Sequence, residues 1–206
     1  GTQRLALSRG ASRAQVLAGQ VGALALLALV VSAGMLLLGA LLGFVLGPAL
    51  GASIPAIPAE GLLQLLGFWM AIALQLFAYA LIALLLGTLG RSTAAGIAGS
   101  LGYLIVEVIV SSILTTIALE VSFSDPNFSN ALGHVQAFFL GPNLSATLSG
   151  VNQAPLDLGG QNSSSVTSAL AIYVIPPLQG LAVSLLYCIL LGGLSYWVLR
   201  RRDVTN

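Results

Sequence analysis

The sequence predicts an all-α protein, a polytopic bundle of membrane helices, and two observations support this prediction. First, only 6% of the 206 residues are charged, whereas a soluble domain carries about 25%. With 57% hydrophobic residues and a mean hydropathy of +1.00, the chain has too few charges to cover a surface that faces water. Second, the sequence contains four apolar segments that each reach the length of about 20 residues needed to cross a bilayer.

The four predicted spans belong to a single transmembrane domain that covers residues 1–206. They are residues 16–47, 61–89, 93–119 and 169–199. The first span is longer than the bilayer requires, so we expect its N-terminal end to project from the membrane or to tilt. Near the outer end of the fourth span stand Pro176 and Pro177. We expect a kink there, with a hinge as the alternative.

The placement of the arginines predicts the orientation. The chain contains no lysine, and its seven arginines fall in residues 4–13, at 91 and in residues 200–202. Four spans bring all of them to one face, while the loops 48–60 and 120–168 hold no basic residue. Because cytoplasmic loops are enriched in Lys and Arg, that face is predicted to be cytoplasmic. We therefore expect a multi-pass protein of the plasma membrane with both ends of this chain in the cytoplasm.

The long outer loop, residues 120–168, is predicted to contain structure of its own. Residues 131–149 carry enough apolar side chains for one or two short helices at the membrane or dipping into it. Residues 150–167 are rich in Ser, Asn and Gly, a composition typical of irregular segments.

Small residues recur every four positions in three of the spans, a pattern that lets helix backbones approach closely in lipid. We expect these ladders to pack within the chain, with a dimer interface as the alternative. The ladders are Gly39, Gly43 and Gly47; Gly96 and Ser100; and Ser184, Cys188 and Gly192.

Glu107 lies near the middle of the third span, where a charged side chain costs about 3 kcal/mol or more. Such residues usually face the bundle interior or a wet cavity. One interpretation is a site on the pathway for a substrate, a cation or a proton. The other is a protonated or hydrogen-bonded structural residue that is paired with Tyr103, Ser111 or Gln75. Gln75, in the second span, could itself line a pathway. A metal site needs several convergent ligands, so we predict none here.

No motif in the sequence predicts catalysis. A phosphate-binding P-loop requires a lysine, and the chain has none. Dinucleotide-binding, zinc-protease and nucleophile-elbow motifs are also absent. We therefore expect no catalytic residue, no bound cofactor and no nucleic-acid partner. If the protein moves a substrate with the energy of ATP, another subunit must bind the ATP.

The first twenty residues, GTQRLALSRGASRAQVLAGQ, lead directly into the first span. This pattern resembles the cytoplasmic linking segment of permease subunits in the type-2 exporter family of ATP-binding-cassette (ABC) transporters. That family usually has Pro where Gly10 stands, and often Lys where Gln20 stands. The end of the chain, Trp197–Val204, is similar to the closing span of the family with its basic tail. The segment Phe138–Gly150 looks like the short re-entrant helices that precede this last span.

The resemblance implies a transport function, export as its direction, and a set of partners. The family has six spans, so the chain would match spans three to six and would begin at the link after span two. A separate cytoplasmic ATPase would bind ATP and dock on the coupling segment, residues 1–15, and a second permease copy would complete a homo- or heterodimer. The residues implied to contact the ATPase are Arg4, Leu5, Leu7, Ser8, Arg9, Ser12 and Arg13. The alternatives are a membrane scaffold or assembly factor, and an ion-coupled carrier that uses Glu107.

Overall fold

The described residues of this computed structural model, 12–49, 51, 59–152 and 175–201, form six α-helices and no strand. Four of these helices are long and apolar enough to cross a membrane, which confirms the predicted fold class. The long helices are α2 (Arg13–Ala49), α3 (Ala59–Gly90), α4 (Thr93–Val121) and α8 (Pro177–Arg201). The short ones are α5 (Pro126–Gln136) and α6 (Leu140–Asn152).

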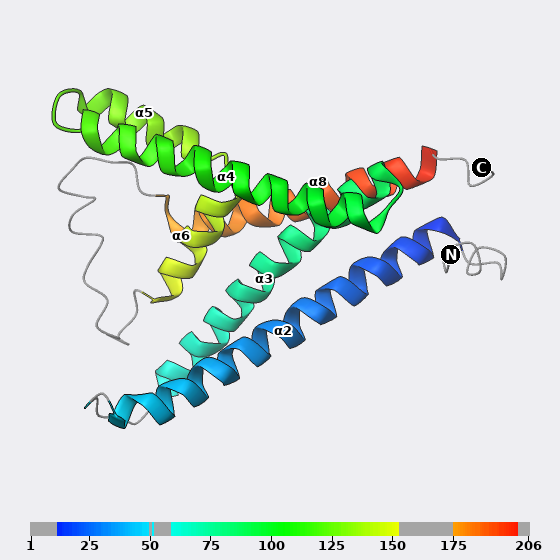
Figure 1. The fold of residues 1–206 in the computed structure, drawn as a ribbon, viewed down its shortest axis with the longest axis horizontal. Coiled ribbons are helices and arrows are strands. Elements are labelled where there is room, and N and C mark those ends of the chain that lie inside the picture. Colours follow the sequence, from blue (N-terminus) through cyan, green and yellow to red (C-terminus); the bar gives the residue numbers. More distant parts are fainter. Residues whose placement is uncertain (1–11, 50, 52–58, 153–174, 202–206) are drawn as a thin grey trace.

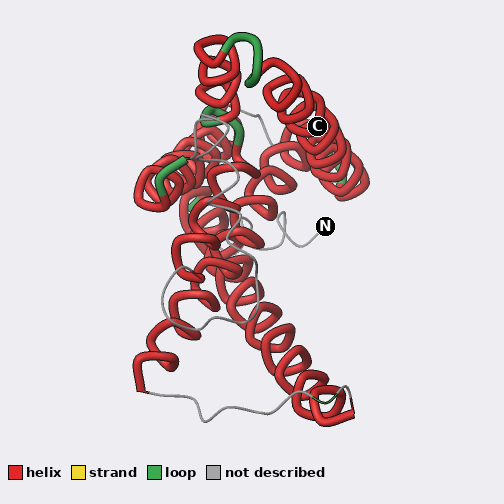
Figure 2. Tube along the Cα trace, turned by 90° about the vertical axis from the view of Figure 1, so that its left-hand side faces the viewer, coloured by secondary structure: helices red, strands yellow, loops and turns green. Residues whose placement is uncertain are grey.

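Helix α3 is the centre of the bundle, because it contacts α2, α4, α6 and α8 (Figure 1). The start of α2, the turn between α3 and α4, and the end of α8 all lie at the same end of the molecule. In Figure 2 the described chain is helical apart from short loops and turns. The successive long helices therefore run in alternating directions, as four successive spans require.

The turn between α3 and α4 is tight and brings the two helices into close contact. Ser92 caps α4, since its hydroxyl oxygen accepts a hydrogen bond of 3.0 Å from the backbone N–H of Ala95. Arg91 takes a positive φ of 55°, a conformation that few non-glycine residues adopt. One turn into α4, a Cβ on Gly96 would lie 2.7 Å from the carbonyl oxygen of Ala83. Gly96 thus packs within the chain, as its ladder predicts.

Helix α2 has 37 residues and would extend about 55 Å, well beyond the ~30 Å of the hydrocarbon core. It is fixed to α3 near its middle, where the indole N–H of Trp69 donates a 3.2 Å hydrogen bond to the carbonyl of Leu29. Beyond this contact, residues 37–46 are exposed on every side of the helix. At Gly39, Gly43 and Gly47, an added Cβ would meet no atom within 4 Å. The prediction that this ladder packs within the chain is therefore wrong.

Helix α8 begins later than the predicted fourth span. Ile175 and Pro176 precede the helix, Pro177 is its first residue, and residues 169–174 lie outside the described part of the chain. Proline suits the first position of a helix, because the N–H that it lacks would have no partner there. The prolines therefore begin the helix instead of producing the predicted kink. Of the third ladder, Ser184 is fully buried, whereas Gly192 has open space around it.

The two short helices form a hairpin between α4 and α8. Helix α5 begins after the Asp125 cap and runs back along α4; residues 137–139 turn the chain, and α6 then packs against α8 and α3 (Figure 1). We call α5, this turn and α6 the re-entrant hairpin. The prediction of one or two short helices is confirmed as two. Residues 150–152, predicted to be irregular, are helical, while 153–167 lie outside the described residues.

Candidate functional site

Glu107 is buried at the middle of α4, with only 4% of its surface exposed. Its carboxylate accepts three hydrogen bonds from three helices. The hydroxyl of Tyr79 on α3 donates to Oε2 over 3.0 Å, and the hydroxyl of Tyr103 on α4 donates to Oε1 over 3.3 Å. The backbone N–H of Gly141, in the first turn of α6, donates to Oε1 over 2.7 Å. The carboxylate thus joins α3, α4 and α6.

Each of these partners is positioned by its own helix. Tyr103 precedes Glu107 by four residues, so both side chains lie on one face of α4. The ring of Tyr79 is tilted by 55° against that of Tyr103, with 6.5 Å between the ring centroids. A Cβ on Gly141 would lie 3.3 Å from Oε2 of Glu107 and 3.4 Å from the Tyr79 hydroxyl. Glycine at position 141 therefore allows the α6 backbone to approach the carboxylate.

The electrostatics of the contact between Glu107 and Gly141 depend on the N-terminal end of α6. The first N–H groups of an α-helix lack partners within the helix, and the helix dipole adds positive charge there. Inside a bilayer no water can satisfy such a donor, and each unsatisfied group costs several kcal/mol. Glu107 supplies the missing acceptor at the start of α6 from a neighbouring span. The carboxylate thus lies in the position that the acceptor of a helix cap occupies.

The turn of the re-entrant hairpin is also held by side chains from α6 and α8. Asn143 is fully buried, and its amide N–H groups donate to the carbonyls of Ala137 and Phe139 over 2.7 and 2.6 Å. The hydroxyl of Tyr187 on α8 donates to the carbonyl of Phe138. All three carbonyls of the turn, residues 137–139, thus accept a hydrogen bond from a side chain.

Apolar packing supports the same region. Leu140 and Leu144 of α6 are 0% and 1% exposed and form the core cluster with Ala78 and Ile82 of α3. Helix α8 approaches α6 so closely that a Cβ on Gly180 would lie 2.5 Å from the carbonyl oxygen of Asn143. The buried polar groups of the hairpin therefore lie beside the buried apolar cluster of α3 and α6.

The structure places the residues predicted around Glu107 as follows. Tyr103 hydrogen-bonds the carboxylate, as the i, i+4 spacing predicts. Among the described residues, neither Ser111 nor Gln75 does so; the Ser111 hydroxyl is buried without a partner, and Gln75 is half-buried on α3. Sequence reasoning missed Tyr79 and Gly141, because both contacts depend on the tertiary arrangement of the helices. The sequence signal available was the buried acid itself, which requires donors.

The predicted coupling segment is described only at its end. Arg4, Leu5, Leu7, Ser8 and Arg9 lie outside the described residues.

The last residues of this segment form the start of α2. Ser12 caps the helix, since its hydroxyl oxygen accepts a 3.2 Å hydrogen bond from the N–H of Gln15 while the Gln15 side chain accepts one of 2.8 Å from the N–H of Ser12. This reciprocal pair is a capping box, and Arg13 follows as the first residue of α2. The described end of the predicted coupling segment, from Ser12, is thus the start of the long helix α2.

The basic end of α8 carries an aromatic contact. The guanidinium carbon of Arg201 lies 4.1 Å from the centroid of the Trp197 ring, a cation–π geometry that suits the boundary between lipid and water. Among the described residues, no three or more His, Cys, Asp or Glu side chains gather as metal ligands would.

The sequence of the chain matches a known protein family. A family model described as "ABC-2 family transporter protein" matches residues 1–204. No curated protein and no solved structure matches the chain. The matched range includes the predicted coupling segment, all six described helices and the re-entrant hairpin.

Proposed function

The chain belongs to the ABC-2 transporter family, and from this premise we propose that it is the permease subunit of an ATP-driven exporter. The family forms the membrane part of ABC transporters, has no catalytic activity of its own and binds no cofactor. The observation that carries the proposal is the family match over residues 1–204. The four long apolar helices add the multi-pass architecture that a permease needs. The outward direction of transport rests on the resemblance to type-2 exporters.

In this proposal, a separate cytoplasmic ATPase docks on the coupling segment, residues 1–15. The contact residues are Arg4, Leu5, Leu7, Ser8, Arg9, Ser12 and Arg13. The capping box at Ser12 supports a mechanical role, because it joins the segment directly to a helix that extends about 55 Å. A displacement of the segment by the ATPase would therefore be transmitted along α2 to its contact with α3 at Trp69.

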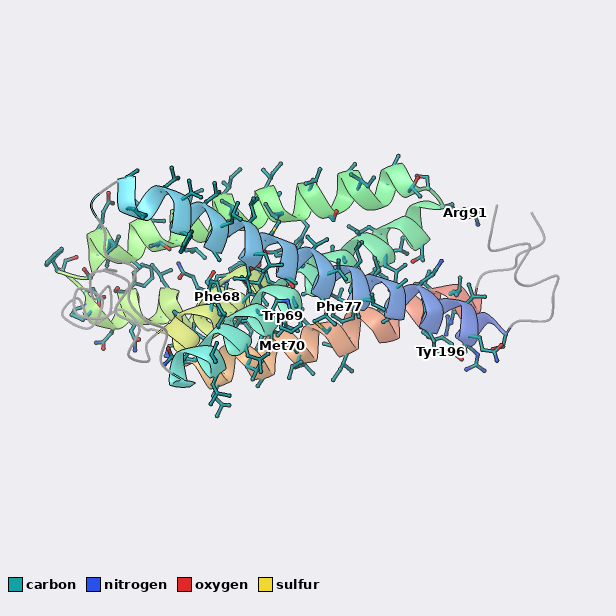
Figure 3. All side chains as sticks on the ribbon, turned by 90° about the horizontal axis from the view of Figure 1, so that it is seen from below. Phe68, Trp69, Met70, Phe77, Arg91 and Tyr196 are labelled. Carbon is teal, nitrogen blue, oxygen red and sulfur yellow. The ribbon has the colours of Figure 1, made fainter. Side chains whose placement is uncertain are left out.

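The cytoplasmic side is proposed to be the end of the bundle that carries the arginines. The start of α2, Arg91 and the end of α8 lie together at one end, on the right in Figure 3, where Arg91 and Tyr196 are labelled. The positive-inside rule assigns such an end to the cytoplasm. An ATPase at this end would have access to the coupling segment and to ATP.

A second permease copy is proposed to complete the transporter. Residues 37–46 of α2 are exposed on every side, so this part of the helix has room for a neighbour in the membrane. The open ladder of Gly39, Gly43 and Gly47 would permit a close approach of another helix. These features are compatible with either a homodimer or a heterodimer.

The coupling assignment can be tested by co-purification of the permease with a co-expressed candidate ABC ATPase subunit. The double substitution Leu7→Asn with Arg9→Asn removes one apolar contact and one charge from the coupling segment. We expect the ATPase to be lost on purification and ATP-dependent transport to fall at least about tenfold, which corresponds to 1.4 kcal/mol of docking free energy.

Arg91→Asn is the matched control, since it removes a charge at the same end of the bundle and asparagine tolerates a positive φ. It should retain docking and transport. Unchanged docking and turnover in the double variant would contradict the role of residues 1–15. A permease that never co-purifies with an ATPase and transports without ATP would contradict the ATP-driven function as a whole.

A further inference from the structure

The re-entrant hairpin creates a problem that the lipid solvent cannot solve. Gly141, in the first turn of α6, contacts Glu107 at the middle of α4, so α6 begins near the depth at which α4 is half-way across the membrane. A helix that starts there presents backbone N–H groups where no water is present. The hairpin is stable at this depth only if the protein itself supplies acceptors.

We propose that Glu107 is a positioning residue that caps α6 from α4 and anchors the re-entrant hairpin at the middle of the bundle. The 2.7 Å hydrogen bond from the Gly141 N–H to Oε1 is the anchor. The hydroxyls of Tyr103 and Tyr79 hold the two carboxylate oxygens in place, one on Oε1 and the other on Oε2.

A carboxylate fits this position for a geometric reason. The cap must reach from α4 to the α6 backbone and must also accept hydrogen bonds from two tyrosine hydroxyls on α3 and α4. The two oxygens of Glu107 receive all three donors, and the side chain is long enough to cross from one helix to the next. A serine or threonine hydroxyl on α4 would offer a single oxygen on a shorter side chain.

The hairpin is held from both sides: Ser129 and Gln136 hydrogen-bond α5 to α4, and Glu107 is the polar contact of α4 with α6. Tyr187 and the close approach of Gly180 tie the turn and α6 to α8.

Glu107 ties α6 to the pair α3 and α4, which pack tightly at Gly96. Loss of the Glu107 anchor should therefore let the start of α6 move away from α4, while the apolar packing of Leu140 and Leu144 on α3 and the contact with α8 remain.

This role distinguishes Glu107 from an ion-carrying residue. The three hydrogen bonds occupy the carboxylate with donors that belong to the protein. A glutamine at position 107 keeps an oxygen for the Gly141 N–H, and its amide N–H can donate to the Tyr79 hydroxyl, which is both a donor and an acceptor. The anchor should thus survive the loss of charge but not the loss of the polar head group.

The test measures the distance between α6 and α4 by spin-label spectroscopy in lipid nanodiscs. Labels are attached to cysteines at two exposed positions, Ser149 on α6 and Thr116 on α4, after Cys188→Ala removes the native cysteine. We expect the distance distribution to shift and broaden in Glu107→Leu. In Glu107→Gln we expect it to match the protein with native Glu107.

A second label pair, Thr93 with Thr116, lies entirely on α4 and should give the same distance in every variant that folds. If Glu107→Leu does not fold, Gly141→Ala replaces it, because the added Cβ would lie 3.3 Å from Oε2 of Glu107. Its matched control is Gly192→Ala, where the Cβ meets no atom within 4 Å.

Two results would overturn the proposal. An unchanged α6–α4 distance in Glu107→Leu, or in Gly141→Ala where Glu107→Leu does not fold, would mean that Glu107 is not the anchor. A shift in Glu107→Gln as large as in Glu107→Leu would mean that the negative charge is required, as an ion-carrying site would need. The measurement uses neither ATP nor a partner subunit, so its outcome is independent of the proposed transport function.

Discussion

Asn143 is a buried amide whose role depends on donating hydrogen bonds. It is fully buried, and both of its bonds run from the side-chain nitrogen to carbonyls of the turn at Ala137 and Phe139. Asn143→Asp keeps the shape of the side chain but places a second oxygen against those two carbonyls. We expect the variant to lose about 3 kcal/mol of stability, the cost of an aspartate at membrane depth. Thermal unfolding of the purified protein in detergent measures this loss.

Asn130→Asp is the matched control, because Asn130 lies on α5 and is exposed. The same chemical change there should alter stability by no more than about 0.5 kcal/mol. Equal unfolding temperatures for the two variants would contradict the assigned role of Asn143 in holding the turn.

Glu107 illustrates what a sequence can predict about a single residue. Its burial and its bond to Tyr103 follow from two local facts, an acid within an apolar span and a four-residue spacing on one helix face. The bonds from Tyr79 and Gly141 join positions 28 and 34 residues away. No periodicity within one helix can indicate such partners, because they depend on how the helices pack.

At the scale of elements, the glycines separate into those that permit a contact and those that do not. Both kinds occur on α8. A Cβ on Gly180 would lie 2.5 Å from the carbonyl oxygen of Asn143, while one on Gly192 meets no atom within 4 Å. Gly180→Ala should therefore force α6 and α8 apart and cost about 1–3 kcal/mol. Gly192→Ala should be neutral or stabilise the helix by up to about 1 kcal/mol.

The same unfolding assay compares the two glycine variants, and the α6–α4 label pair indicates whether the hairpin has moved. If Gly180→Ala is as stable as Gly192→Ala, the close packing of α6 on α8 is contradicted. The comparison also explains why the predicted ladders had different outcomes. Small residues at four-residue spacing indicate that a close approach is possible, but the partner helix decides whether it occurs, as Gly96 on α4 and Gly39 on α2 demonstrate.

At the scale of the whole molecule, the sequence predicted the features that a lipid environment imposes on the chain. Four long helices follow from the near absence of charge, because a backbone in lipid must satisfy its own hydrogen bonds. The predicted ends were less accurate where prolines occur: Pro177 begins α8 eight residues after the predicted start at 169. The depth of the re-entrant hairpin was not predictable, since its anchor is a contact between α4 and α6.

The orientation of the molecule gives the last prediction, and two exposed positions at opposite ends of α4 test it. Thr93 follows the Arg91 turn, and Ser124 lies just beyond the end of α4. Each is changed to cysteine in a Cys188→Ala background and treated with a maleimide that does not cross membranes. We expect Ser124→Cys to react in intact cells and Thr93→Cys to react only after permeabilisation, because the positive-inside rule places Arg91 in the cytoplasm. The opposite pattern would mean an inverted protein, with the coupling segment out of reach of a cytoplasmic ATPase. Reaction of both positions in intact cells would mean that α4 does not cross the membrane.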